Sequence, residues 1–342
     1  MNSLIRLRAA LITAALLALG VVAGAAAPAG AATAAGTAAD AKTATAPDPT
    51  CGPARTQERS VNHTFGTTVM RGTPRRVVVL ELSFVDAALA VGVRPVGIAD
   101  DNNKTRILPQ YRAKLGNYTS LGFRATPNLE TISSLNPDLI IADADRHANI
   151  HRQLERIAPT IVLDSLKQAY QPNLHSAVVI GQALNKCGAM IKRLQRHRAN
   201  IRKVARVIPD NERRNVMFAV TASTVFNMHN SRAYTGSLLQ VLGLRSTEQQ
   251  KVGGNPYNRL TLETLFTFDP DILILAKSGK NTMADKWADS PIWQQLKAVR
   301  NNQVYLVDQN LWSRWRGISA AEVMAQQTAR LIYKKYVKLT IG

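Results

Sequence analysis

Residues 129–141 of the chain read LETISSLNPDLII, and residues 262–274 read LETLFTFDPDILI. In both copies a proline follows the glutamate by seven residues, and the two copies lie 133 residues apart. The proline ends a short helix in each copy, and the apolar run after it is typical of a buried strand. The repeat therefore predicts two structurally alike lobes with a pseudo-twofold relation, and a ligand site in the cleft between them.

Short apolar runs alternate with amphipathic stretches on both sides of this repeat. Continuous apolar runs between helices indicate parallel strands that helices cover on both faces. The predicted strands are residues 76–80, 96–99, 139–142, 160–163, 215–220, 272–276 and 303–307. The predicted helices are residues 83–90, 128–135, 236–242, 262–268 and 318–336, and a hairpin is predicted over 59–70.

A helical stretch joins the two series of strands. Residues 173–207 contain no strand signal, and apolar residues recur there at helical spacing until Pro209. One helix over 186–207 would run roughly 33 Å, enough to join two lobes. We therefore predict an α/β protein in which two Rossmann-like lobes with parallel sheets are joined by one long helix. The predicted parts are an N-terminal lobe over 58–170, linking helices over 171–209 and a C-terminal lobe over 210–342. A single stiff connection also predicts only a small closure on ligand binding.

The start of the chain predicts a secreted protein. Residues 1–32 combine Arg6 and Arg8 with an apolar run and small residues, which is typical of a cleavable signal peptide; an uncleaved anchor is the alternative. Residues 33–57 are rich in alanine, threonine and proline and predict a flexible tether. Cys51 is not preceded by the apolar and small residues of a lipoprotein signal. It is expected to pair with Cys187 or to stay free, and lipid attachment is the further alternative.

Composition and charge limit the classes of protein to which the chain can belong. The chain has 342 residues, with 43 Lys and Arg against 23 Asp and Glu, a formal net charge of +20. Only two cysteines occur, so a disulfide-framed mini-domain and a structural zinc protein are excluded. Disorder, a coiled coil and a polytopic membrane protein are excluded as descriptions of the bulk. The positive charge favours an anionic ligand, and a secreted binder of anionic polymer or nucleic acid is the alternative from another class.

Motifs for catalysis and cofactor binding are missing. The sequence lacks G-x-S-x-G, G-x-x-x-x-G-K-[ST], G-x-G-x-x-G, H-E-x-x-H and C-x-x-C. Parallel sheets without a phosphate-binding loop argue against the use of a nucleotide. His147 and His151 have the i,i+4 spacing of metal ligands, with His229 as a candidate third ligand. A solvated helix residue is the simpler interpretation of His151.

Arginines and tryptophans gather in loops that follow predicted strands, where ligand-facing residues of parallel sheets lie. Arg124 and Arg146 stand in two such loops, and residues 312–316 read WSRWR. Guanidinium groups match carboxylates in bidentate geometry, and aromatic rings beside them supply apolar walls. The arginines together predict a ligand that bears several carboxylates. A salt bridge at the rim is the alternative for any single arginine.

Five segments carry a resemblance to a known family. They are residues 76–102 (RVVVLELSFVDAALAVGVRPVGIADDN), 137–147 (PDLIIADADRH), 226–229 (FNMH), 235–237 (TGS) and 312–322 (WSRWRGISAAE). The chain resembles the periplasmic substrate-binding proteins that feed iron–siderophore and cobalamin ABC importers, which are class III periplasmic binding proteins. Within that family it is most similar to the members that bind iron(III) dicitrate. The likeness runs from about residue 59 to residue 336.

The resemblance implies a binding protein rather than an enzyme. Its implied ligand is ferric citrate, with iron carried inside the chelate, no cofactor and no direct metal ligand from the protein; another ferric siderophore is the alternative. It also implies a periplasmic monomer that binds no nucleic acid and docks to an inner-membrane permease through Glu130 and Glu263, for which helix capping is the simpler interpretation. The neutral loop 221–223 departs from the basic contact expected there. The implied ligand-binding residues are Ser83, Arg124, Arg146, His147, Asn227, Trp312, Arg314 and Arg316.

Overall fold

The computed structural model describes residues 58–247 and 254–341. The predicted signal peptide, the tether and Cys51 lie outside the described residues. All described residues belong to one compact unit of the chain. None of the helices in the described part of the chain is long and apolar enough to cross a membrane.

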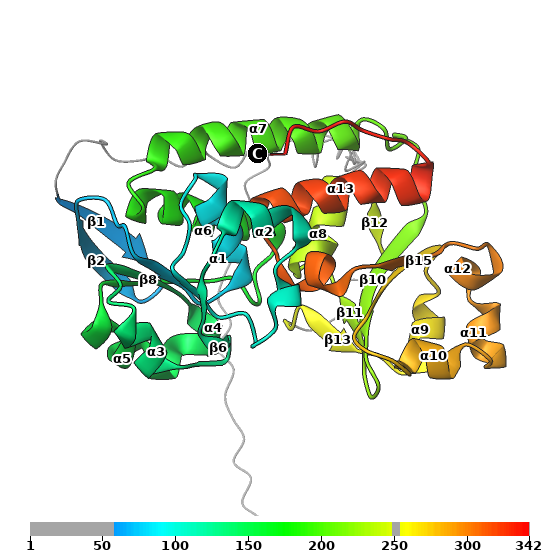
Figure 1. The fold of residues 1–342 in the computed structure, drawn as a ribbon. Helices are drawn as coiled ribbons and strands as arrows, with labels where there is room; N and C mark the ends of the chain where they lie inside the picture. Colours follow the sequence, from blue (N-terminus) through cyan, green and yellow to red (C-terminus); the bar gives the residue numbers. More distant parts are fainter. Residues whose placement is uncertain (1–57, 248–253, 342) are drawn as a thin grey trace, which may run out of the picture. The chain divides into compact units, whose positions relative to one another are not determined.

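The first sheet has five parallel strands in the order β5-β4-β3-β8-β9. The strands are β3 (Val77–Val79), β4 (Gly97–Ile98), β5 (Thr119–Ser120), β8 (Leu139–Asp143) and β9 (Thr160–Leu163). Every residue of β3 and β8 is buried, as the continuous apolar runs predict for strands covered on both faces. This sheet and its helices form the N-terminal lobe (Figure 1). An antiparallel hairpin of β1 (Glu58–His63) and β2 (Gly66–Arg71) precedes it, as predicted.

The second sheet, in the C-terminal lobe, is mixed. Its order is β13-β11-β10-β14-β15, with β12 paired to β10. The strands are β10 (Asn215–Thr221), β11 (Phe226–His229), β12 (Arg245–Ser246), β13 (Tyr257–Arg259), β14 (Ile272–Lys277) and β15 (Val304–Val307). The prediction of a wholly parallel sheet is wrong here, because β11 and β13 run antiparallel to their neighbours. Only residues 222–225 join β10 to β11, and a connection that short permits a hairpin but no crossover helix.

The repeat in the sequence appears as two equivalent units. Asn128 caps α3 (Leu129–Ser134) and Thr261 caps α9 (Leu262–Phe268) with their side-chain oxygens. Each helix is followed by a residue with positive φ and then by a buried strand that pairs with the first strand of its sheet. The Asp138 carboxylate accepts backbone hydrogen bonds at the start of β3, and the Asp271 carboxylate accepts one at the start of β10. The two lobes are therefore built alike.

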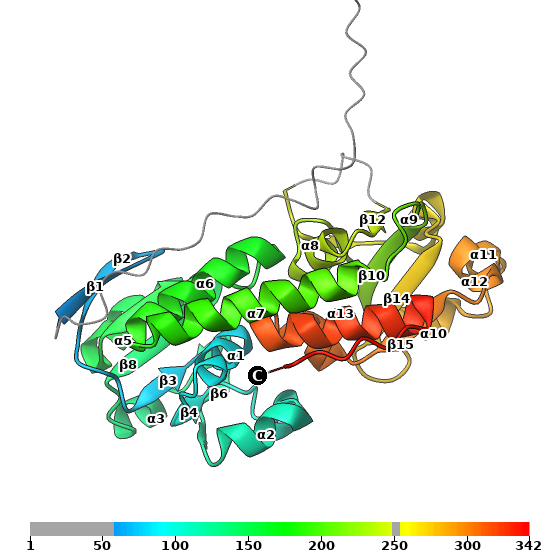
Figure 2. The same cartoon turned by 90° about the horizontal axis from the view of Figure 1, so that it is seen from above.

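Two helices link the sheets: α6 (Tyr170–Ala183) and α7 (Cys187–Ala205). The predicted helix over 186–207 is confirmed to within two residues at either end. Its apolar side chains, among them Met190, Leu194 and Ile201, are buried. α7 packs along α13 (Ile318–Tyr333), the last helix of the chain, as Figure 2 shows.

The remaining short elements cover the sheets and form their edges. In the N-terminal lobe they are α1 (Leu82–Ala90), α2 (Pro109–Leu115), α4 (Ala144–His147), α5 (His151–Ile157), β6 (Gly122–Phe123) and β7 (Thr126–Pro127). In the C-terminal lobe they are α8 (Tyr234–Val241), α10 (Met283–Trp287), α11 (Pro291–Gln295) and α12 (Lys297–Arg300). Single turns of 3-10 helix span Lys104–Arg106 and Ala148–Ile150, and a π-helix spans Asn310–Arg314.

Candidate ligand-binding site

A buried carboxylate gathers three arginines where the two lobes meet. Glu81 lies two residues after the end of β3 and has no exposed surface. Its oxygens lie 2.9 Å from Arg124 Nη1, 2.9 Å from Arg146 Nε and 3.3 Å from Arg316 Nη2. Arg124 and Arg146 belong to the N-terminal lobe and Arg316 to the C-terminal lobe. The structure thus brings three of the predicted arginines together around a residue that the sequence analysis did not select.

The charge of Glu81 is set by these contacts. Burial alone would raise its pKa, but the guanidinium groups of Arg124, Arg316 and Arg146 hold the pKa of Glu81 far below the ordinary value of 4.5. The carboxylate is therefore ionised wherever the protein is folded at ordinary pH. It fixes the arginines that surround it and neutralises only part of their charge.

A second carboxylate, Asp101, follows β4. It lies 2.9 Å from Arg124 Nη2 and 3.4 Å from Arg106 Nε. Burial opposes its ionisation, but hydrogen bonds from Arg124 lower the pKa of Asp101 overall. Arg106 also donates to Asn310 Oδ1 at 3.1 Å, so this contact again joins the two lobes.

Arg314 differs from the other arginines because no salt bridge is found for it within the described residues. Its Nη1 donates to Asn310 Oδ1 at 3.2 Å. Burial, followed by repulsion from Arg106 and Arg124, lowers the pKa of Arg314 to about 10. A guanidinium whose proton affinity is depressed by neighbouring cations lies in a region of excess positive potential. In this arginine cluster (Arg106, Arg124, Arg146, Arg314 and Arg316) Arg314 is the member without a salt bridge to a carboxylate of the described residues.

The segment that holds the last two arginines has irregular backbone. Arg314 ends the π-helix, and Arg316 has φ 28°, in the left-handed region that disfavours side chains. The Arg316 Nη2 atom is buried and makes no hydrogen bond, although Glu81 lies within ion-pair distance. π-helices and strained residues gather at functional sites, where the rest of the fold maintains them.

Ser83 reaches the arginine cluster through Ser165. Its hydroxyl is 2.7 Å from the Ser165 hydroxyl, which in turn lies 3.4 Å from Arg316 Nε. Asn227 is half-buried on β11, and no hydrogen bond joins it to the arginines. The structure therefore places Ser83 with the arginines and leaves Asn227 apart from them.

His147 and Trp312 are both fully buried and use their polar atoms inside the protein. His147 Nδ1 accepts from the Asp143 amide at 2.8 Å, so Nε2 carries the proton and donates to the Arg124 carbonyl at 2.7 Å. The Trp312 indole donates to Gln327 Oε1 at 2.6 Å. The polar ring atoms of both side chains are thus bound by other parts of the protein. His147 instead ties the loop of Arg124 to the end of β8.

The sequence analysis did not select Glu81, Asp101, Arg106 or Tyr257. The Tyr257 hydroxyl donates to the Leu166 carbonyl, which is another contact between the lobes. A signal existed for Glu81 and Asp101, since each is an acidic residue two or three positions after a buried strand. No comparable signal marks Tyr257, because its role depends on where β13 joins the sheet.

The three histidines considered as metal ligands stay apart. His147 is committed to backbone partners, His151 lies 3.5 Å from Glu155, and the His229 ring packs against Phe218 and Tyr257. Within residues 58–247 and 254–341 no group of three or more His, Cys, Asp or Glu side chains has the geometry of a metal site.

His229 is expected to make the protein less stable in mild acid. Burial, with repulsion from Arg316, lowers its pKa from 6.5 to about 3. Below about pH 6.5 the unfolded chain therefore binds a proton that the folded protein does not bind until about pH 3. The free energy of unfolding decreases as the pH is lowered through this window. This one proton lowers the free energy of unfolding by up to about 1.4 kcal/mol for each pH unit. The melting temperature of His229→Phe should fall less between pH 7 and pH 5 than that of the wild type. His175→Phe, at an exposed position, should follow the wild type.

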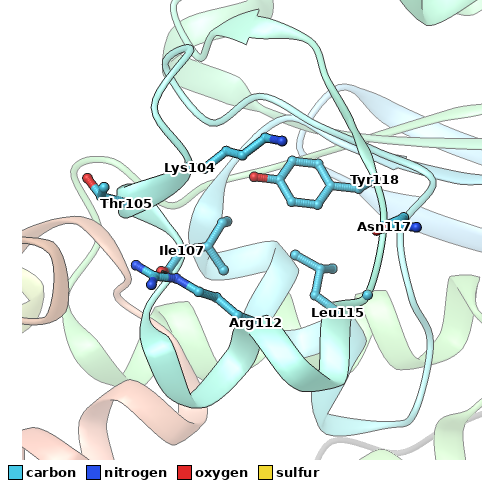
Figure 3. A pocket seen from close by; sticks show the side chains of 8 residues that line it. Lys104, Thr105, Ile107, Arg112, Leu115, Asn117 and Tyr118 are labelled. Carbon is cyan, nitrogen blue, oxygen red and sulfur yellow. Dashed lines mark hydrogen bonds between the residues drawn. The ribbon is translucent and has the colours of Figure 1, made fainter.

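A separate cavity of about 310 Å³ lies beside α2 (Figure 3). Ile107 and Leu115 form its apolar part, and the Lys104 side chain extends toward the Tyr118 ring. Its two cationic side chains, Lys104 and Arg112, are exposed to solvent. Exposed cations bind anions weakly, so the buried arginine cluster is the stronger candidate site.

Comparison with known proteins places this architecture in a family. The model of the periplasmic binding protein family matches residues 77–311. The chain belongs to the periplasmic binding protein family. This periplasmic binding protein is 42% identical over 277 residues to the Fe(3+)-citrate-binding protein YfmC of Bacillus subtilis, covering 81% of this chain and 87% of YfmC. It is 41% identical over 274 residues to the Fe(3+) dicitrate-binding periplasmic protein FecB of Escherichia coli, covering 80% and 90%. Both relatives are named as binding proteins and not as enzymes.

Solved structures agree with the fold. Staphylococcus aureus SirA in complex with staphyloferrin B superposes with a TM-score of 0.72 at 25% identity, over 80% of this chain and 98% of SirA. The petrobactin-binding protein YclQ of Bacillus subtilis superposes with a TM-score of 0.71 at 20% identity, over 82% of this chain and 100% of YclQ. The class of two lobes joined by a long helix, predicted from the sequence, is thus confirmed.

Proposed function

We propose that this periplasmic binding protein captures ferric citrate and delivers it to the permease of an ABC importer. The observation that carries the proposal is Arg314, a half-buried guanidinium that lies among other arginines and has no carboxylate partner within the described residues. Citrate in the ferric complex presents carboxylates, which guanidinium groups bind in bidentate geometry. The names of YfmC and FecB, at 41–42% identity, support the same ligand.

The iron itself needs no ligand from the protein in this proposal. Citrate oxygens hold the iron, and the arginines compensate the negative charge of the whole complex. The protein then has no cofactor and no catalytic role. Its proposed contacts are the arginine cluster, in which every member but Arg106 was predicted from the sequence, together with the predicted Ser83 and Asn227. The complex would compete with Glu81 for Arg316.

The remaining parts of the proposal concern the chain as a whole. We place it in the periplasm as a monomer, released by a cleaved signal peptide over residues 1–32. Its proposed lobes span 58–170 and 210–342, with the linking helices over 171–209. Nucleic acid is not a proposed partner.

Titration of the mature protein with ferric citrate tests the ligand. Trp312 and Trp315 flank Arg314 in the chain, so their emission should change on binding. We expect saturable micromolar binding of ferric citrate, with little response to citrate alone or to a ferric hydroxamate siderophore. Tighter binding of another ferric chelate would identify that chelate, and not ferric citrate, as the ligand. Binding of DNA or heparin that falls linearly with salt on logarithmic axes, whatever the iron content, would favour an anionic-polymer binder.

Docking to the permease is proposed to involve Glu130 and Glu263. Both are exposed and stand in the first turn of the equivalent helices α3 and α9. Figure 1 shows these helices on the side of the protein away from α7. The proposal pairs these glutamates with positive charge on the permease, so arginines at the same positions would create like-charge contacts. Such a contact costs several kcal/mol in an interface. The double variant Glu130→Arg, Glu263→Arg should therefore reduce ferric citrate uptake by cells at least about tenfold. The Kd for ferric citrate should not change.

The matched control is Glu155→Arg, another exposed glutamate of the N-terminal lobe, at a position with no equivalent in the repeat. It should leave uptake unchanged. Normal uptake by the double variant would assign both glutamates to helix capping alone.

A further inference from the structure

The two most specific segments of the sequence, LELSFVDA and WSRWRGISAAE, meet in the structure through Asp86 and the start of α13. Asp86 lies on α1 in the N-terminal lobe and has no exposed surface. Its Oδ2 accepts hydrogen bonds from the backbone amides of Ser319 and Ala320, both at 3.0 Å. These amides belong to the first turn of α13, where no side chain of the helix itself supplies a cap. A carboxylate from the other lobe therefore caps this helix.

Gly317 makes this contact possible. A Cβ atom at Gly317 would lie 2.2 Å from Asp86 Oδ2 and 2.4 Å from Asp86 Cβ, so the carboxylate occupies the space that any side chain would need. Gly317 directly follows Arg316, the strained residue of the arginine cluster. The Gly317 carbonyl is in turn held by the Tyr234 hydroxyl at 2.7 Å. The backbone after Arg316 is thus fixed from both lobes.

A second set of contacts leads from Asp86 to the arginine cluster. The Tyr111 hydroxyl lies 3.4 Å from Asp86 Oδ2, and the Tyr111 ring stacks on the Trp315 ring at 4.4 Å and 10°. The Trp315 indole donates to the Arg106 carbonyl at 2.6 Å. Asp86 therefore contacts the backbone after Arg316 directly and, through Tyr111, the side chain of Trp315, which binds the Arg106 carbonyl.

One short helix supports the arginine segment at two points. The N-cap of α1 is Glu81, whose carboxylate binds the Arg316 side chain, and Asp86 stands five residues later on the same helix. Burial raises the pKa of Asp86, which means that the fold disfavours the charge it buries there. A group retained at such a cost is better explained by positioning than by stability.

We propose that Asp86 and Gly317 are positioning residues of the ligand site, which hold Arg314 and Arg316 in place by fixing the start of α13 onto α1 across the junction of the lobes. What the arginines bind rests on the proposed function. The positioning itself is a property of the backbone, and it can be measured without a ligand.

The test uses Asp86→Ala and Asp86→Asn in the full mature chain. Alanine removes the cap, whereas asparagine keeps one oxygen that can accept from Ser319 and Ala320. We expect Asp86→Ala to raise the Kd for ferric citrate about tenfold, as loss of one charge-assisted contact would, and Asp86→Asn to raise it less. Leu296→Ala is the control, because Leu296 is fully buried in a separate hydrophobic cluster and its loss lowers stability without touching the site.

Hydrogen exchange shows whether the effect of Asp86→Ala is confined to the arginine segment and the start of α13 or spread over the whole fold, and the Kd then shows whether the local change reaches the ligand site. In Asp86→Ala, peptides over residues 314–322 should exchange faster, while the rest of α13 and the central strands keep their protection. Leu296→Ala should leave these peptides protected. A folded Asp86→Ala protein with wild-type Kd and wild-type exchange at 314–322 would overturn the inference, and so would an equal loss of affinity in Leu296→Ala.

The exchange experiment also separates the inference from the proposed function. If the wild type does not bind ferric citrate, the proposed function fails, and the inference is decided by exchange alone. Faster exchange confined to 314–322 in Asp86→Ala would then still support the positioning role, and unchanged exchange would refute it.

Discussion

Arg314→Ala is expected to raise the Kd for ferric citrate by about 10- to 100-fold. Charge-assisted hydrogen bonds contribute roughly 1.5–3 kcal/mol each, and each 1.4 kcal/mol is a factor of ten in Kd. Arg314 is the best-placed arginine for this measurement, because no salt bridge depends on it within the described residues. Removing Arg124 or Arg316 would instead leave Glu81 with a lost partner and would mix binding with stability. Calorimetric titration of a variant whose melting temperature matches the wild type gives the value directly.

Two further variants show which property of Arg314 matters. Arg314→Lys keeps the charge but loses the planar fork, so its affinity should fall between those of the wild type and the alanine variant. Arg330→Ala removes an exposed arginine of α13 and should leave the Kd unchanged. If Arg314→Ala binds ferric citrate as tightly as the wild type, the unpaired guanidinium is not where the anion binds, and the observation that carries the proposed function is lost.

Local patterns predicted most of the fold. The apolar run at 139–142 is part of β8, and the helical spacing over 186–207 is α7, because burial on both faces or on one face leaves a period in the sequence. β11 and β13 were not predicted as strands. β13 is partly exposed, and the turn at 222–225 before β11 contains none of the glycine, asparagine or proline residues that mark a hairpin. The antiparallel direction of β11 is a consequence of that turn.

The site was predicted less completely, for a physical reason. Arginines after strands were recognised one at a time, and the structure does bring Arg124, Arg146 and Arg316 together. Glu81 was not recognised, since a sequence does not show which cations a buried carboxylate will meet. Residue type alone also led to the selection of His147 and Trp312. Each has chemistry suited to a ligand, but its polar atoms are used by Arg124 and Gln327.

The carboxylates of the protein neutralise only part of the charge of the arginine cluster. Five arginines brought together would repel one another, and two carboxylates reduce that repulsion without removing it. The positive charge that remains at Arg314 is the part available to a ligand. A protein that binds anions by this arrangement must keep its own carboxylates fixed, because a mobile Glu81 would compete for the guanidinium groups.

Glu81→Gln is expected to lower the free energy of unfolding by about 3–5 kcal/mol, the usual effect of removing one partner from a buried ion pair. The side chain keeps its size, but three guanidinium groups lose the charge that compensates them. Because the pKa of Glu81 is depressed in the folded state, its contribution is fully present above about pH 4.5 and is lost only as the pH falls further. The difference between variant and wild type in urea denaturation should therefore be constant from pH 7 to pH 5.

The same variant separates stability from binding. Glu81→Gln adds one unit of positive charge to the site, so ferric citrate should bind it at least as tightly as the wild type and, at equal ligand concentration, should stabilise it at least as much as the wild type. Glu155→Gln, which removes an exposed carboxylate, should change stability by less than about 0.5 kcal/mol. A loss below about 1 kcal/mol in Glu81→Gln would mean that the arginines relax into solvent when Glu81 is neutral. The carboxylate would then not organise the cluster, and the arginines would have to be arranged by the ligand itself.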